Sequence, residues 1–175
     1  MKAIFLDHDG VICLSTEWGS RFNKPGRYTT HQFDNFNKKA VSVLNSIIKE
    51  TDAEIVVSSD WRYYCTLEEM GVVYTDAKIS KKPIDYIPRG DFSPDNFKYT
   101  RQSDLAQRRS WEIKKYLSER NDITHWVAID DMYMGEIYDF DKNFLWGLSN
   151  FVHTPRSSEG IKQSGVKDKI LKFLK

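Results

Sequence analysis

Two carboxylates one residue apart follow a short apolar segment near the start of the chain. In the run from Lys2 to Ile12, Asp7 and Asp9 come directly after the apolar residues, and Gly10 follows them. Side chains in a strand alternate between its faces, so both acids are expected to point the same way, and Gly10 lets the chain turn sharply there. Such a pair could bind a metal ion or exchange protons, although Asp and Gly also occur together in calcium loops and ordinary turns.

Polar residues also follow two later apolar segments. The first of these segments leads into Ser58, Ser59 and Asp60, and the second ends at Asp130 and Asp131. Between them lies a basic helical segment with Arg108, Arg109, Lys114 and Lys115. In an open α/β sheet the carboxyl ends of the strands border one crevice, where ligands bind. An ordered set of acids, hydroxyls, a cation and further acids arises by chance far less often than any of its members, so it indicates one functional site.

The elements that must position these residues alternate along the chain. Strands are predicted at Ala3 to Leu6, Glu54 to Val57 and Trp126 to Ile129, with weaker candidates at Gly71 to Tyr74, Phe144 to Trp146 and Asn150 to Val152. Helices are predicted from Phe36 to Ile48, from about Asp104 to Glu119 and from Gly160 to Leu174. This alternation implies parallel pairing through right-handed crossovers. The sequence therefore predicts an α/β fold, a three-layer α/β/α sandwich with a Rossmann-like parallel sheet.

Length and composition narrow the class of protein. A chain of 175 residues fits one domain spanning 1–175 with a sizeable core. Its 26 Lys and Arg nearly balance its 25 Asp and Glu, so no global field favours nucleic-acid or membrane binding. Cys13 and Cys65 are too few for a disulfide framework and lack the spacing of a metal site, and no secretory signal or long apolar run is visible. We therefore expect a cytoplasmic protein that does not bind a membrane.

Two connections are longer than a simple α/β fold requires. The segments 14–35 and 76–103 are rich in Gly, Pro, Ser, Thr, Asn and Asp, and basic and aromatic residues are interleaved with them. Long loops are commonly functional or disordered. Both segments are therefore candidates for contacts with a substrate.

The ordered set resembles the haloacid dehalogenase-like (HAD) superfamily. That superfamily has an Asp-x-Asp strand end, a Ser or Thr strand end, a basic residue and an acidic strand end, and the resemblance here runs from Lys2 to Asp131. The segments FLDHDGVI, IVVSSDWR, RSWEI and VAIDD are similar to a small-phosphatase branch found among phage and bacterial proteins and in RNA-repair assemblies. Thr154 with Gly160 and Ile161 resembles the usual ending of that branch. The resemblance implies a phosphatase with minimal cap insertions.

The chemistry of phosphate esters explains why such a site uses acids. A phosphate monoester is close to a dianion, and Mg²⁺, which favours carboxylates, waters and phosphate oxygens, would offset its repulsion of an anionic nucleophile. Asp7 would attack phosphorus and form an aspartyl-phosphate, and Asp9 would act as acid and then base. Asp7, Asp130 and Asp131 would form the metal site, with Asp131 either a water-bridged ligand or an orienting group. The resemblance implies that the backbone carbonyl of Asp9 also reaches the metal.

The remaining assignments leave alternatives open. Ser58 is preferred for hydrogen bonding to a phosphoryl oxygen because it directly follows the apolar run, while Ser59 could bind substrate or cap the helix near Asp60. Arg109 is preferred as the cation, three residues before Glu112, where the superfamily more often has Lys. Arg108, Lys114 and Lys115 are competing candidates that could simply form a solvated helix face.

Three further residues lie beside these motifs. Trp61 and Arg62 could frame the substrate mouth, although Trp61 could instead pack on the sheet edge. His8 should point away from its flanking acids, which favours a buried, hydrogen-bonded histidine over a ligand.

The size of the two insertions bears on the substrate. Neither segment is long enough to fold as an independent cap domain, so the site is expected to be open. An open site suits a nucleotide or a nucleic-acid end, whose phosphates and bases could contact the basic and aromatic residues. A phosphatase for small metabolites and a catalytically weak phosphate-binding or regulatory module are the alternatives. A receiver domain is disfavoured because no Asp follows an internal apolar strand in the required order.

Overall fold

The chain folds into alternating strands and helices. The computed structural model describes residues 1–16, 36–88, 102–139 and 144–175. The strands are β1 (Lys2–Leu6), β2 (Glu54–Val57), β3 (Pro83–Tyr86), β4 (His125–Asp130), β5 (Ile137–Asp139), β6 (Phe144–Trp146) and β7 (Phe151–His153). The helices are α2 (Lys38–Thr51), α3 (Leu67–Asp76), α4 (Gln102–Ser118) and α5 (Val166–Leu174), with two 3₁₀ turns, η2 (Asp60–Tyr63) and η3 (Gly160–Lys162).

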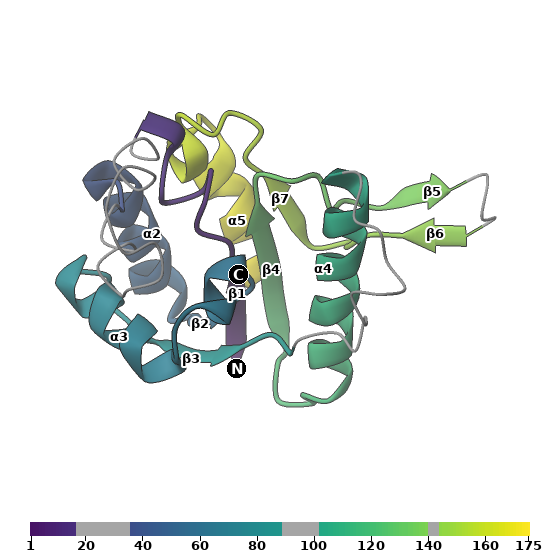
Figure 1. Cartoon of the computed structure of the whole chain (residues 1–175), viewed down its shortest axis with the longest axis horizontal. Coiled ribbons are helices and arrows are strands. Elements are labelled where there is room, and N and C mark those ends of the chain that lie inside the picture. Colours follow the sequence, from purple (N-terminus) through teal and green to yellow (C-terminus); the bar gives the residue numbers. More distant parts are fainter. Residues whose placement is uncertain (17–35, 89–101, 140–143) are drawn as a thin grey trace.

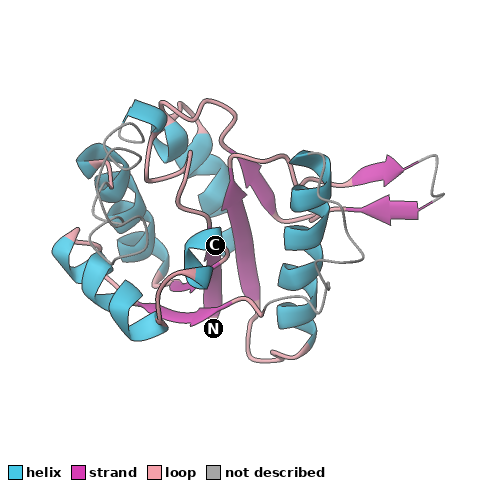
Figure 2. Ribbon diagram, in the orientation of Figure 1, coloured by secondary structure: helices cyan, strands magenta, loops and turns pink. Residues whose placement is uncertain are grey.

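Five parallel strands form the central sheet. Their order is β3-β2-β1-β4-β7, so β1 lies in the middle with β2 and β4 on either side. Figure 1 shows α2, α3 and α5 on one side of this sheet and α4 on the other. The predicted three-layer α/β/α sandwich with a Rossmann-like parallel sheet is therefore confirmed (Figure 2).

Alternation along β1 divides the core between the two sides. Ile4 and Leu6 belong to a buried cluster that also contains the apolar faces of α2, α3 and α5. Ala3 and Phe5 belong to a second cluster with α4, in which the ring of Phe5 lies edge-on to that of Tyr116, 5.7 Å away. Because β1 is buried on both faces, its carboxyl end is held in place from both sides.

The three strongest strand predictions are confirmed, and the weaker ones had mixed outcomes. Gly71 to Tyr74 is wrong, because it lies inside α3, which begins at a capping box in which Thr66 and Glu69 each accept from the other's backbone N–H. The sheet edge is formed instead by Pro83–Tyr86, which the sequence did not predict. Pro83 is tolerated as the first residue of this edge strand.

The carboxyl-terminal third also departs from expectation in detail. Phe144–Trp146 is a strand, but it pairs antiparallel with Ile137–Asp139 in a separate two-stranded sheet. The predicted terminal helix is divided into η3 and α5, and Gly165 precedes α5 with a left-handed φ of 78°. This glycine lets the chain change direction before the helix begins.

The two predicted insertions fall largely outside the described residues. Of segment 14–35, the structure describes 14–16, and of segment 76–103 it describes 76–88 and 102–103. The described part of the second insertion contains the end of α3 and the strand β3. Among the described helices, none combines the length and apolar character needed to cross a membrane.

Candidate active site

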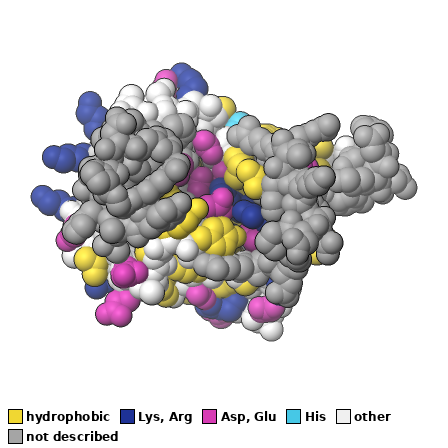
Figure 3. Space-filling model, in the orientation of Figure 1, with side chains coloured by type: hydrophobic (Ala, Val, Ile, Leu, Met, Phe, Trp, Pro, Cys, Tyr) yellow, Lys and Arg dark blue, Asp and Glu magenta, His cyan; other side chains and the backbone are white. Residues whose placement is uncertain are grey.

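The site forms where the three central strands end together. The parallel register places Leu6 beside Val57 of β2 and Ile129 of β4, so the next residue of each strand lies at the same level. The backbone N–H of Asp7 donates to the Ile129 carbonyl at 3.1 Å. Figure 3 shows acidic and basic side chains gathered in the middle of the face above these strand ends.

Three carboxylates meet at this edge. One oxygen each from Asp7, Asp130 and Asp131 lies within 4.8 Å of the other two, and Asp7 and Asp130 are buried. Burial, followed by the negative charge of Asp130, raises the pKa of Asp7 well above its ordinary value, and burial with Asp130 raises the pKa of Asp131 to about 6. Buried carboxylates that oppose one another's ionisation in this way suit a hard divalent cation. The donor set therefore fits Mg²⁺.

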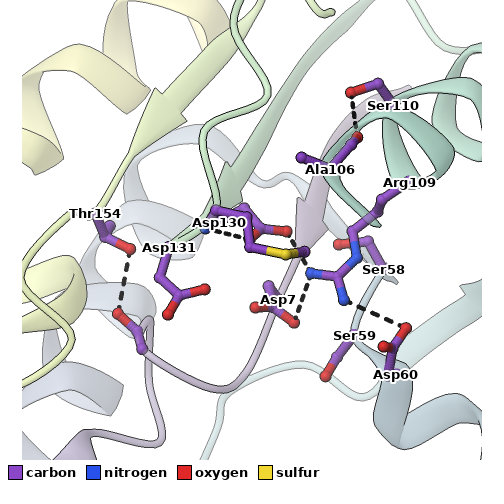
Figure 4. Close-up of polar contacts among 12 residues, drawn as sticks. Asp7, Ser58, Ser59, Asp60, Ala106, Arg109, Ser110, Asp130, Asp131 and Thr154 are labelled. Atoms are coloured by element: carbon purple, nitrogen blue, oxygen red, sulfur yellow. Dashed lines mark hydrogen bonds and ion pairs between the residues drawn. The ribbon is translucent and has the colours of Figure 1, made fainter. Parts of the chain in front are cut away.

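A glycine and a threonine allow Asp131 to approach this group. Gly10 has a φ of +70°, and a Cβ built on it would lie 2.3 Å from Asp131 Oδ2, so a side chain at this position has no room. The Thr154 hydroxyl donates to the Gly10 carbonyl at 3.1 Å, and the Thr154 N–H donates to the Asp130 carbonyl at 2.9 Å. Thr154, noted in the sequence through the resemblance alone, therefore links the first and last acidic motifs (Figure 4).

Arg109 is the cation that reaches the carboxylates. Its Nη1 lies 2.5 Å from Asp130 Oδ2 and 3.3 Å from Asp7 Oδ1, and its Nη2 lies 3.3 Å from Asp60 Oδ1 (Figure 4). Burial opposes the charge of this guanidinium, but the carboxylates of Asp130 and Asp7 raise its pKa well above the ordinary value. Helix α4 thus presents a permanently charged group to Asp7.

The competing basic residues of α4 lie elsewhere. Arg108 pairs with Asp60 at 3.2 Å and with Glu112 at 3.7 Å, while Lys114 and Lys115 are exposed. Of these candidates, the structure brings Arg109 to Asp7.

The two serines after β2 have different surroundings. Ser58 is fully buried, and its hydroxyl has no hydrogen-bond partner among the described residues. Ser59 accepts a hydrogen bond from the Trp61 N–H at 3.4 Å and caps η2. A buried hydroxyl without a partner costs free energy, so Ser58 is the serine for which a bound ligand would supply the missing partner.

Asp9 lies outside the group of three carboxylates. Its Oδ2 accepts a hydrogen bond of 2.9 Å from the indole Nε1 of Trp61. The side chain of Asp9 is therefore committed to a different neighbour from that of Asp7, although the two acids are only two residues apart.

The expectation that the Arg62 side chain faces the substrate is wrong. The side chain is 1 % exposed, and its guanidinium donates to the carbonyls of Ser58 and Ser59 and to Glu112 Oε2, the last at 2.6 Å. Trp61 is also buried, and its ring stacks on Phe36. Both residues hold the turn after β2 in place instead of framing an open mouth.

His8 follows the sequence expectation, whereas Asp60 was not singled out. His8 is buried, and its Nε2 forms a hydrogen bond of 2.7 Å with the Tyr74 hydroxyl. The carboxylate of Asp60 contacts Arg62, Arg108 and Arg109, which makes it a common acceptor for three guanidinium groups. The signal in the sequence was an acid directly after a strand-end hydroxyl pair, with Arg62 two residues later and Arg108 and Arg109 on α4.

Fold and site together define a HAD-type α/β domain, since the acids, the serine and the cation occupy one edge of a parallel sheet in the order that this class requires. Residues 3–163 match the family described as the HAD domain in Swiss Army Knife RNA repair proteins, and the chain belongs to that family. Membership supports a phosphatase-type hydrolase. Comparison with curated proteins and with solved structures gave no significant match.

Proposed function

We propose that this protein is a Mg²⁺-dependent phosphomonoesterase that works through an aspartyl-phosphate on Asp7, and that residues 1–175 form one catalytic domain. The observation that best supports this proposal is the position of Asp7. Its buried carboxylate lies 3.3 Å from the guanidinium of Arg109 and within 4.8 Å of the carboxylates of Asp130 and Asp131. This arrangement supports Asp7 as the nucleophile, Arg109 as a fixed cation and the three carboxylates as metal ligands.

In the first step a carboxylate oxygen of Asp7 forms a bond to phosphorus. The bond between phosphorus and the ester oxygen breaks, and its electron pair goes to that oxygen, which takes a proton from Asp9. Arg109 offsets the negative charge that accumulates on the phosphoryl oxygens, and the Ser58 hydroxyl donates to one of them. These interactions therefore offset the negative charge that the Asp7 carboxylate brings to the phosphoryl group before the alcohol leaves.

In the second step water attacks the phosphorus of the aspartyl-phosphate. Asp9, now ionised, accepts a proton from this water as the new oxygen–phosphorus bond forms. The bond from phosphorus to the Asp7 oxygen breaks, which releases inorganic phosphate and restores the carboxylate. Asp9 thus ends the cycle protonated, ready for the next ester.

Asp7, Asp130, Asp131 and the backbone carbonyl of Asp9 would hold the Mg²⁺. When bound, the ion would neutralise phosphoryl charge and lessen the repulsion among the three carboxylates. The mutual crowding of Asp7, Asp130 and Asp131 supports this assignment.

We propose nucleotides or terminal phosphates of nucleic acid as the substrates. The description of the family as a domain of RNA repair proteins supports this class. The absence of a cap-sized insertion in the sequence also supports an open site that admits a large substrate.

A substrate panel tests the proposal. Phosphate release is measured with Mg²⁺ from mononucleotides, 5′- and 3′-phosphorylated oligonucleotides and sugar phosphates, with Asp7→Asn as the matched inactive control. We expect nucleotides or oligonucleotide ends to be preferred. Preference for sugar phosphates would instead identify a metabolite phosphatase, and a lack of turnover on every substrate would leave a phosphate-binding module.

A further inference from the structure

An indole N–H is directed at the residue assigned to proton transfer. Trp61 lies in η2, at the carboxyl end of β2, and its Nε1 donates to Asp9 Oδ2 at 2.9 Å. Asp9 follows β1, so this contact joins the ends of two neighbouring strands. Hydrogen bonds to carboxylates are stronger and more geometrically demanding than those between neutral groups.

Neighbouring rings hold the indole in place. Trp61 is 4 % exposed and stacks on Phe36 with a centroid separation of 5.3 Å and an interplanar angle of 9°. The ring of His8 lies edge-on to the indole at 4.6 Å, and His8 is itself fixed by its hydrogen bond to Tyr74. Because rings pack on it from more than one direction, the indole cannot rotate without displacing them.

The backbone of Trp61 is fixed by the turn that also carries Ser58. Ser59 caps this turn by accepting from the Trp61 N–H, and Arg62 donates to the carbonyls of Ser58 and Ser59. The orientation of Asp9 is thereby tied to the strand end that presents the buried Ser58 hydroxyl.

We propose that Trp61 is a positioning residue, which sets the rotation of the Asp9 carboxyl group so that it can exchange a proton with the leaving oxygen; this rests on the proposed function. The indole proton engages Oδ2, and we assign the exchanged proton to Oδ1. As the bond from phosphorus to the ester oxygen breaks, this proton passes from Asp9 Oδ1 to that oxygen. In the second step a proton of the attacking water passes to the same atom.

If Trp61 has this role, the effect of replacing it depends on how strongly the leaving group needs a proton. Phenyl phosphate releases a basic oxygen that needs a proton, whereas 2,4-dinitrophenyl phosphate releases a stable anion that does not. Trp61→Phe removes the N–H but keeps an aromatic ring against Phe36. We expect it to lower kcat/KM, which reports the steps up to departure of the leaving group, about tenfold on phenyl phosphate and by less than about threefold on 2,4-dinitrophenyl phosphate.

Two controls separate positioning from structure. Tyr116→Phe removes a hydrogen-bonding hydroxyl that contacts Asp85 in the other core cluster, so it should lower thermal stability while leaving the ratio of the two kcat/KM values unchanged. Replacement of Trp61 by 3-benzothienylalanine removes the N–H at nearly constant shape. This second variant provides the measurement if Trp61→Phe does not fold.

The outcomes separate failure of the role of Trp61 from failure of the proposed function. An equal loss on both substrates, or no loss on either, would overturn the role of Trp61. Asp9→Asn provides the reference, since it should show the same leaving-group selectivity more strongly. If Asp9→Asn lacks that selectivity, or if the unaltered protein releases no phosphate, the proposed function itself fails and the role of Trp61 fails with it.

Discussion

At the scale of single residues, the site has an imbalance of charge. Within the part of the chain that the structure describes, three carboxylates approach one another at the strand ends, and one guanidinium, that of Arg109, reaches two of them. The second nitrogen of Arg109 is directed to Asp60, outside this group of three. The residues alone therefore leave negative charge that a divalent cation would offset.

The geometry of Arg109 gives a prediction about the kind of cation required. Arg109→Lys keeps the charge but cannot reach Asp7, Asp130 and Asp60 with one planar fork, so kcat should fall by about ten- to hundredfold. Steady-state kinetics on an aryl phosphate provide the measurement. Lys114→Met is the matched control on the same helix and should keep full activity, and a larger loss in that control would transfer the cationic role to Lys114.

Gly10 gives a prediction about the metal site. In Gly10→Ala the added Cβ would overlap Asp131 Oδ2, so the Mg²⁺ concentration for half-maximal activity should rise about tenfold or more. Gly165→Ala is the control, because Gly165 also has a positive φ but no atom within 4 Å of the added Cβ. It should lose about 1 kcal/mol of stability with an unchanged Mg²⁺ requirement. Equal Mg²⁺ requirements in the two variants would refute the steric argument.

The sequence allowed the three clustered acids and Arg109 to be placed, but not the surroundings of Arg62 and Asp60. Asp7, Asp130 and Asp131 could be placed because each follows an apolar strand, whose end defines their position. The surroundings of Arg62 could not be predicted, since residue type does not tell whether a guanidinium faces solvent or buried carbonyls. The same limit hid the role of Asp60, whose partners come from η2 and α4.

At the scale of elements, one buried ion pair joins η2 to α4. Arg62 Nη2 lies 2.6 Å from Glu112 Oε2, and both side chains are almost fully buried. Glu112 follows Arg109 on α4 by three residues, and Arg62 also holds the carbonyls of Ser58 and Ser59. This pair therefore fixes the helix that carries the cation relative to the turn that carries the serine.

The ion pair gives a prediction about stability. Glu112→Gln removes the buried carboxylate 2.6 Å from Arg62 and leaves that guanidinium with the more exposed Asp60, 3.4 Å away, so the free energy of unfolding should fall by about 3 kcal/mol. The double variant Arg62→Met with Glu112→Met should lose less than the sum of the two single Met variants. Urea unfolding in a double-mutant cycle measures this coupling, and strictly additive losses would show that the pair contributes none.

Two elements show where prediction of the fold reached its limit. A short apolar run such as Gly71 to Tyr74 fits a strand or a buried helix equally well, and the capping box of Thr66 and Glu69 carried the decisive signal. The edge strand Pro83–Tyr86 was not predicted because it begins with proline and includes a half-exposed isoleucine, Ile84. The central strands were predictable because burial on both faces makes them continuously apolar.

At the scale of the whole molecule, both cysteines belong to the core that supports the site. Cys13 and Cys65 are buried and form no disulfide, and burial raises the pKa of the Cys65 thiol above its ordinary value. A raised pKa keeps the thiol protonated, and the protonated form does not react with disulfide reagents.

We therefore expect thiol reactivity to report on unfolding of the whole domain. The native protein at neutral pH should react with an aromatic disulfide reagent at least about a hundredfold more slowly than the urea-unfolded chain. Absorbance of the released thiolate follows the reaction. Fast modification of the native protein would show that the core opens locally, independently of global unfolding.

The central claim is that Asp7 carries the phosphoryl group. The most direct test is to mix enzyme, Mg²⁺ and an aryl phosphate, quench with acid during the first turnovers, reduce with borohydride and locate the product by peptide mass spectrometry. An aspartyl-phosphate at position 7 is reduced to homoserine there, and the account predicts this conversion at Asp7 but not at Asp9, Asp130 or Asp131. Turnover without any conversion at Asp7, or conversion at another of these acids, would contradict it.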